Sequence, residues 1–132
     1  MNSDELLRQY AEGKSNFRGL DLREVNLVQA KLNGADFSQT DLSKAHLSGA
    51  DLQQANLRSA NLRQADLTHA NLSGADLRNA DLRSALLMWA NLTGANLEGA
   101  NLEWASLTYV RPQNLDLSDV ILGGTILPHG AS

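Results

Sequence analysis

The chain has 132 residues, enough for one domain, and a formal net charge of −4. This mild acidity argues against a dedicated nucleic-acid binder, which needs a basic face, and the absence of cysteine excludes disulfides and thiolate zinc sites. No stretch approaches the roughly 20 apolar residues of a membrane span, and the N-terminal residues lack the apolar run of a signal peptide. We therefore expect a cytoplasmic protein that contacts neither membranes nor nucleic acid directly.

The first predicted element is a short helix over residues 3–12, within an N-terminal segment 1–14. Asn2 and Glu5 match a capping box, and Gly13 suits the end of a helix. We expect this helix to cap the structure that follows rather than to enter a membrane. Four side chains would share its inner side: Leu6, Leu7, Tyr10 and Ala11.

Residues 15–127 repeat with a period of five. Leu or Phe occupies 22 of 23 positions spaced by five, from Phe17 to Leu127, and only Pro112 interrupts the series. The residue two positions earlier is usually Ala, and the residue between the two is usually Asn or Asp. The unit therefore reads A-(N/D)-L-x-x.

This period excludes both a straight helix and a straight strand. In a helix, five residues advance the leucine by a net angle of about 140°, so no apolar stripe forms. In a strand, an odd period places successive leucines on opposite faces. Within one unit, however, Ala and Leu share a strand-like face, so a chain that bends after every unit keeps both inside and winds into a solenoid.

The run ANLRSANLRQADLTHANLSGADLRNADL at residues 55–82 resembles the pentapeptide-repeat family, and the resemblance extends over residues 15–127. It implies an all-β fold, a right-handed quadrilateral β-helix in which four units make one turn. The repeats would then form about five to six coils. Short single-domain members of this family are common in cyanobacteria.

The C-terminal end of the predicted solenoid is irregular. The residues at 111–114 read RPQN, and Pro112 removes a backbone donor. Ile121 and Ile126 occupy positions that hold Asn or Asp elsewhere. These apolar positions predict that something covers the last coil, either the tail 128–132 or another chain.

Four units per coil would stack residue i on residue i+20 and create four faces. The faces are centred on residues 17, 37, 57, 77, 97 and 117 (first), 22 to 122 (second), 27 to 127 (third) and 32 to 112 (fourth), each in steps of twenty.

The third face differs from the others because Asp66 is the one formally charged residue among its outward positions. Apolar patches with aromatic residues and Met often mark interfaces. We predict a site for a protein partner or for self-association; incidental surface and a cover for the tail remain alternatives. The candidate residues are His69, Leu86, Met88, Trp89 and Tyr109, and His129 continues the column of His69, Trp89 and Tyr109.

Six of the eight arginines lie on the first two faces, directly after the central residue. A local basic cluster consists of Arg58, Arg63, Arg78 and Arg83. Like charges stacked one coil apart repel, so Asp76 and Asp81 are expected to pair with them. The cluster is interpreted as a solvated lattice of ion pairs, with an anion or phosphate site as the alternative.

No residue pattern indicates catalysis, a metal or a cofactor. His69 and His129 would lie three coils apart, roughly 14 Å at the usual strand spacing, too far to share one ion. No nucleophile–histidine–acid set and no phosphate-binding glycine loop stands out. Trp104 is isolated on the second face and is interpreted as incidental.

The leading functional hypothesis is a non-enzymatic protein-interaction scaffold, with Trp89 and Tyr109 as anchors. The resemblance suggests a second hypothesis, because some family members mimic duplex DNA, inhibit DNA gyrase and pair through their C-terminal ends. The arginines beside the outward aspartates would neutralise such an acidic stripe. A structural protein without a partner remains a further alternative.

Overall fold

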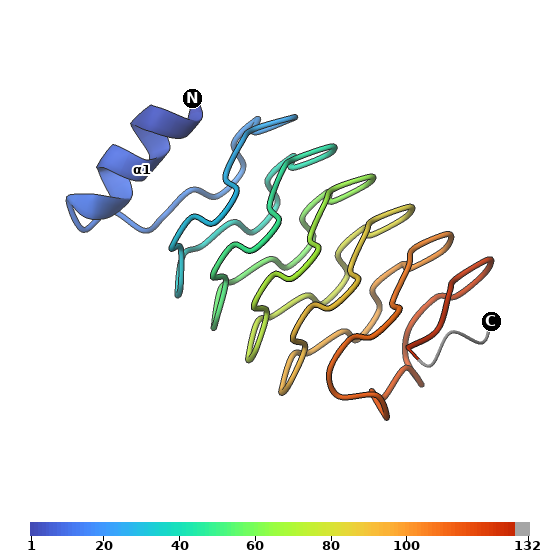
Figure 1. Cartoon of the computed structure of the whole chain (residues 1–132). Helices are drawn as coiled ribbons and strands as arrows, with labels where there is room; N and C mark the ends of the chain where they lie inside the picture. Colours follow the sequence, from blue (N-terminus) through green and yellow to red (C-terminus); the bar gives the residue numbers. More distant parts are fainter. Residues whose placement is uncertain (129–132) are drawn as a thin grey trace.

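The structure, a computed structural model, describes residues 1–128 as a stack of coils with one helix, α1 (Ser3–Ala11), at its N-terminal end (Figure 1). The β-structure of these residues consists of isolated parallel bridges, each of which joins residue i to residue i+20, from Asn16↔Asp36 to Ser106↔Ile126. One coil therefore contains four five-residue units. The predicted β-solenoid with one short helix is confirmed.

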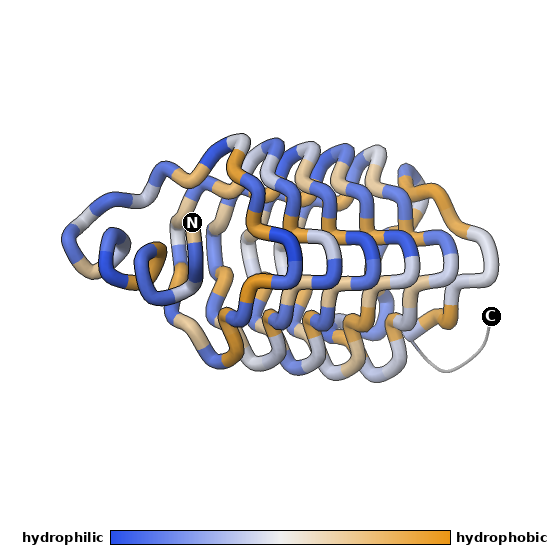
Figure 2. Tube along the Cα trace, turned by 90° about the horizontal axis from the view of Figure 1, so that it is seen from above, coloured by the Kyte–Doolittle hydropathy of each residue, from blue (hydrophilic) through white to orange (hydrophobic). Residues whose placement is uncertain are grey.

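The core is a column of leucines and alanines. Every central residue from Phe17 to Leu107 is at most 5% exposed, and apolar and polar positions recur at the same place in successive coils (Figure 2). Each buried leucine contributes about 1.5–3 kcal/mol of transfer free energy, which the entropy of ordering the chain largely opposes. At the N-terminal end, Phe37 stacks below Phe17 with ring centroids 5.4 Å apart.

The corners of the coils are β-turns. Ala30 donates its N–H to the carbonyl of Leu27 at 3.1 Å, and Gln29 between them has φ of 62°. A positive φ at this turn position is the signature of a type II turn. Among residues 1–128, thirteen non-glycine residues adopt it, all of them two positions after a central residue.

The Asn or Asp of each unit stabilises the turn that follows it. Asn61 accepts a hydrogen bond from the N–H of Arg63 at 3.1 Å, and Asp66 accepts one from Thr68 at 3.0 Å. This Asx contact pairs an outward N–H that the neighbouring coils leave unbonded. It recurs at Asn16, Asp21, Asn26, Asp36, Asp41, Asp51, Asn56, Asn71, Asp76, Asp81, Asn91, Asn96, Asn101 and Asp116.

Helix α1 closes the N-terminal end along a narrow line of contact. Asn2 caps it by accepting the N–H of Glu5 at 2.9 Å, and the helix ends at Ala11, with Glu12 as the C-cap. Leu6 is fully buried, and the Tyr10 hydroxyl donates to the carbonyl of Asn33 at 2.7 Å.

Two of the four helix side chains expected on the coil point elsewhere. Leu7 is 36% exposed and Ala11 is exposed, so that part of the prediction is wrong. Leu6 and Tyr10 are four residues apart and share one side, and each of the other two lies about 100° further round the helix. Within residues 1–128, no helix is long and apolar enough to cross a membrane.

The last coil departs from the register of the others. Asn79 donates its N–H to Glu98, nineteen residues ahead, but Gly99 in the next coil donates to Asp119, twenty residues ahead, at 2.7 Å. The disturbance expected near 111–114 therefore continues to Asp119. Leu122 is 41% exposed although it is a central residue.

Candidate functional site

The outer column of the third face forms an aromatic ladder of His69, Trp89 and Tyr109. The ring centroids of Trp89 and Tyr109 are 4.5 Å apart with planes at 22°, and those of His69 and Trp89 are 6.0 Å apart with planes at 7°. Trp89 is 51% exposed and Tyr109 52%. His129, expected next in this column, lies outside the described residues.

The ladder stands on an unfavourable backbone. His69, Trp89 and Tyr109 have φ of 61°, 64° and 60°, a left-handed conformation that costs roughly 1–2 kcal/mol per non-glycine residue. Aromatic stacking contributes about 0.5–1.5 kcal/mol per pair, so the two pairs offset part of this cost. Such positions favour Gly or Asn, so the large aromatic side chains there indicate a role for their exposed edges.

The ladder belongs to a weakly charged surface. Leu86 is 41% exposed, and Met88 is half-buried beside Trp89. The carboxylate of Asp66 is held by the N–H of Thr68. The structure thus brings together His69, Trp89 and Tyr109 as one continuous feature, with the apolar side chains of Leu86 and Met88 on the same face.

The four arginines of the basic cluster form two separate columns. The guanidinium of Arg78 donates two hydrogen bonds to the carboxylate of Asp76, at 2.9 and 2.6 Å, and Arg83 binds Asp81 in the same way. The other arginine in each column lies farther from a carboxylate. The Nε atom of Arg58 is 4.0 Å from Oδ2 of Asp76.

Arg63 has no carboxylate within 4.0 Å among residues 1–128. An arginine in an Asp-Leu-Arg unit is therefore clamped by its own aspartate, as Arg23 is by Asp21. An arginine in an Asn-Leu-Arg unit lacks that clamp. Two of the four arginines, Arg78 and Arg83, are thus paired within their own units, and the interpretation of the cluster as a lattice of ion pairs stays a prediction.

These pairs change the acidity of the aspartates. The side-chain hydrogen bond from Arg78 holds the pKa of Asp76 below its ordinary value, and Arg83 does the same to the pKa of Asp81, while burial acts in the opposite direction. Both carboxylates are therefore ionised and engaged near neutral pH.

The Trp104 side chain packs against the following coil although it is 71% exposed. A Cβ added at Gly124, one coil further on, would come within 2.8 Å of three atoms of the Trp104 ring. The indole therefore lies against the backbone of Gly124, which has φ of 65°. The sequence expectation that Trp104 is incidental did not anticipate this contact.

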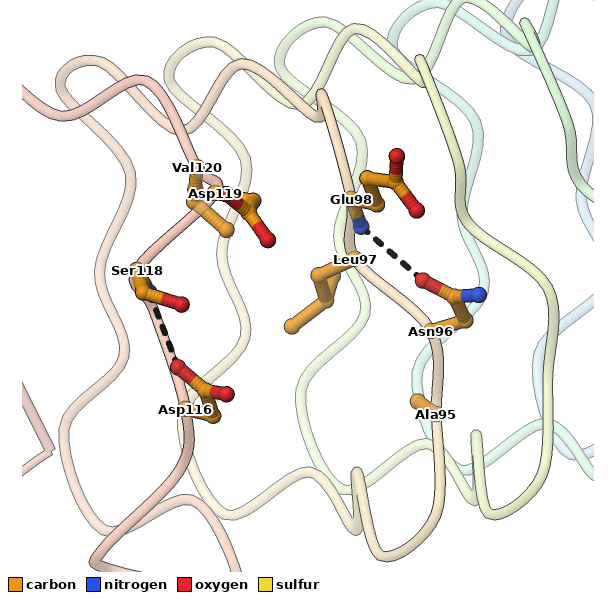
Figure 3. A pocket seen from close by; sticks show the side chains of 8 residues that line it. All are labelled: Ala95, Asn96, Leu97, Glu98, Asp116, Ser118, Asp119 and Val120. Carbon is orange, nitrogen blue, oxygen red and sulfur yellow. Dashed lines mark hydrogen bonds between the residues drawn. The ribbon is translucent and has the colours of Figure 1, made fainter.

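A cavity opens on the first face where the register shifts. It holds about 230 Å³ between the stretches 95–98 and 116–120, and the side chain of Leu97 lies between the two stretches (Figure 3). Glu98, Asp116 and Asp119 contribute carboxylates to its lining. They do not converge on a point, and residues 1–128 contain no group of three or more His, Cys, Asp or Glu arranged to hold a metal ion.

The comparisons with known proteins agree with the geometry. The profile of the family Pentapeptide repeats matches eight copies over residues 14–49, 45–83 and 85–124. The chain is a pentapeptide-repeat protein. No curated protein matches it by sequence.

Solved pentapeptide-repeat proteins resemble the chain at 35–40% identity. HetL from Nostoc sp. strain PCC 7120, described as involved in heterocyst differentiation regulation, is 39% identical over 95% of this chain and 61% of HetL, with a TM-score of 0.58. A protein of the Arabidopsis thaliana thylakoid lumen is 35% identical over 83% of this chain and 62% of that one, with a TM-score of 0.57. This pentapeptide-repeat chain thus spans about three fifths of the length of these two relatives.

A second Nostoc pentapeptide-repeat protein, alr5209, is 40% identical over 92% of this chain and 95% of that one, with a TM-score of 0.46. Two of these three relatives are therefore cyanobacterial.

Sequence reasoning missed three features of this pentapeptide-repeat surface. The Asx turns were predictable from the fixed position of Asn and Asp before each central residue. The packing of Trp104 had a weaker signal, the glycine twenty residues later. The cavity on the first face had none, because it depends on how the chain regains register after Pro112.

Proposed function

We propose that this chain is a non-enzymatic protein-interaction scaffold. A right-handed quadrilateral β-helix, capped by α1, would hold the third face rigid, and that face would bind a protein partner or a second copy of the chain. The C-terminal end offers a second route to a partner. The observation that carries the proposal is the exposed ladder of His69, Trp89 and Tyr109.

The chemistry of the third face supports this role. Trp and Tyr are the side chains most often found to dominate binding energy at protein interfaces. Stacking already orders the two rings, so binding would cost little side-chain entropy. Leu86 and Met88 add apolar area, and the one carboxylate, Asp66, is engaged within its own turn.

The charge pattern favours a scaffold over a DNA mimic. A mimic of duplex DNA needs a continuous acidic stripe, but Asp21, Asp76 and Asp81 are each bound by two hydrogen bonds from an arginine side chain. The likeness to HetL, described as involved in regulation, fits a role exerted through binding. We place the protein in the cytoplasm, and the thylakoid-lumen relative makes that lumen the second compartment to test.

The test uses three matched baits: the native chain, a Trp89→Ser/Tyr109→Ser variant and a Trp104→Ser variant. Each captures proteins from cytoplasmic and lumenal fractions of a cyanobacterial lysate, and each captured protein is then purified and titrated against all three baits by calorimetry. Trp104 is the control because it is exposed and aromatic but lies on the second face, against Gly124, so a loss of binding confined to this variant would point to the C-terminal route instead.

We expect a partner that binds the native chain and the Trp104→Ser variant with equal affinity and binds the double variant at least about 100-fold more weakly, as loss of hot-spot anchors predicts. Circular dichroism confirms that each variant remains folded. Equal binding to all three baits would overturn the assignment to the third face, and no specific partner for any bait would favour a purely structural role.

A further inference from the structure

Each coil offers the following coil a fixed set of backbone groups. Leu62 and Gln64 donate their N–H groups to carbonyls of the next coil, at 2.7 and 3.0 Å, and the carbonyl of Ala60 accepts an N–H from it at 2.9 Å. These three contacts recur through the regular coils. The edge of each coil that faces the C-terminal end therefore presents the backbone groups with which one more strand can pair.

The last coil presents the same groups without partners among residues 1–128. They are the N–H groups of Leu122, Gly124 and Leu127 and the carbonyls of Val120 and Thr125. All five lie in the short segment 120–127, on the second and third faces. An unpaired row of this kind readily pairs with an added chain.

Exposed apolar side chains lie next to this row of backbone groups. Leu122 is 41% exposed, whereas Leu102, directly above it, is fully buried. Ile121 and Ile126, which replace the usual Asn or Asp, are 51% and 43% exposed. A hollow of about 360 Å³ is lined by Leu122, Gly123, Gly124, Thr125 and Leu127.

The surroundings of this end are acidic. Residues 98–128 contain four carboxylates and one arginine, a formal net charge of −3. The carboxylate of Glu103 lies against the edge, since a Cβ on Gly123 would be 3.3 Å from its Oε2 atom. Asp119 is exposed directly before the edge segment.

We propose that segment 120–127 binds an extended, basic segment of a partner protein by strand addition. The bound segment pairs its backbone with the open row and runs parallel to it, as every bridge in the rod does. Its apolar side chains enter the hollow, and its Lys or Arg side chains face Glu103 and Asp119. This deepens the C-terminal route named above and does not depend on the aromatic ladder.

A second copy of the chain fits this edge less well. Its N-terminal end is covered by α1, whose Leu6 is fully buried, so a head-to-tail stack would have to displace the helix. Its C-terminal end carries the same net negative charge, and like charges repel when they are brought together. Both considerations favour a basic partner segment.

The probe is a capped peptide of alternating Val and Lys residues, long enough to span segment 120–127. The matched control peptide replaces each Lys with Glu. Peptide affinity is measured by fluorescence anisotropy, and amide hydrogen exchange locates the contact. The protein variants are Glu103→Gln/Asp119→Asn, Trp89→Ser/Tyr109→Ser and a chain that ends at Pro128.

We expect the basic peptide to slow amide exchange of Leu122, Gly124 and Leu127 about tenfold, and the acidic peptide to have no effect. The Glu103→Gln/Asp119→Asn variant should bind the basic peptide about fivefold more weakly. The chain ending at Pro128 should bind it as the native chain does. The Trp89→Ser/Tyr109→Ser variant should also bind it unchanged, which separates this proposal from the one on the third face.

Several outcomes would overturn the proposal. They are equal binding of both peptides, protection elsewhere on the rod, or binding that appears only in the chain ending at Pro128, which would show that the tail covers the edge. Protection of the same three amides without peptide, together with a dimer mass in sedimentation, would assign the edge to a second copy.

Discussion

The regular coils, residues 16–110, and the last coil, residues 111–128, contain the same repeat. They differ in how well their central side chains are buried and how many of their backbone groups are hydrogen-bonded. In the regular coils the central side chain is buried, most corners carry an Asx contact, and each coil pairs with the one that follows it. In the last coil the register shifts, Ile replaces Asx twice, and the C-terminal edge has no backbone partner among residues 1–128. The comparison shows that a unit's stability depends on its neighbours as much as on its own residues.

The largest expected effect concerns the core. Leu67→Ala, at a fully buried central position, should lower the free energy of unfolding by about 2–5 kcal/mol because it leaves a cavity. Leu122→Ala removes the same atoms from a side chain that is 41% exposed, so it should cost less than about 1 kcal/mol. Urea denaturation followed by circular dichroism measures both, and equal losses would contradict the comparison.

An intermediate effect concerns the Asx turns. Asn61→Ala removes the acceptor for the N–H of Arg63 and should cost about 1 kcal/mol, whereas Asn61→Asp retains the acceptor and serves as the control. Ile121→Asn offers a second acceptor to the N–H of Gly123, which already donates to Thr125 Oγ1 at 3.2 Å, so it should leave stability nearly unchanged. Thermal unfolding of the three variants decides, and a loss of stability in Ile121→Asn would show that the isoleucine is buried by something else.

A smaller effect concerns pH. The pKa values of Asp76 and Asp81 are lowered in the folded chain, chiefly by hydrogen bonds from Arg78 and Arg83. Their stabilisation is therefore present above the unfolded pKa of about 3.9 and is lost as the pH falls through the lower folded pKa values.

Asp76→Asn/Asp81→Asn should flatten the acid limb of the stability curve, measured by urea denaturation from neutral pH down through this range. Asp116 in the last coil also has a lowered pKa, caused by a backbone hydrogen bond from Ser118, but it is fully exposed. Asp116→Asn should change the curve less than the double variant does, and the reverse order would contradict the assignment of the pH dependence to the two clamped pairs.

Periodicity alone predicted much of the molecule. Leu and Ala at fixed positions implied an inward face, and the family resemblance supplied the twenty-residue coil. Together these placed His69, Trp89 and Tyr109 in one column. The prediction succeeded because a solenoid converts sequence spacing directly into spatial neighbours.

Other features lay beyond the pattern. The sequence placed the arginines in two columns, but side-chain rotamers decide how close each comes to a carboxylate, such as the 4.0 Å between Arg58 and Asp76. Which side chains of α1 face the first coil depends on how the helix docks there. Leu6 became buried and Leu7 did not, although both are apolar neighbours.

By itself, the sequence pattern determined the solenoid and its core residues, because each unit repeats the same local constraint, and the family resemblance supplied the surface columns. Only the tertiary structure decided where that repetition fails: the shifted register at Gly99, the cavity beside Leu97 and the edge at Leu122 that lacks a partner among residues 1–128. These features arise where a unit lacks a matching neighbour, and the pairing of neighbours is a property of the folded stack rather than of any single repeat.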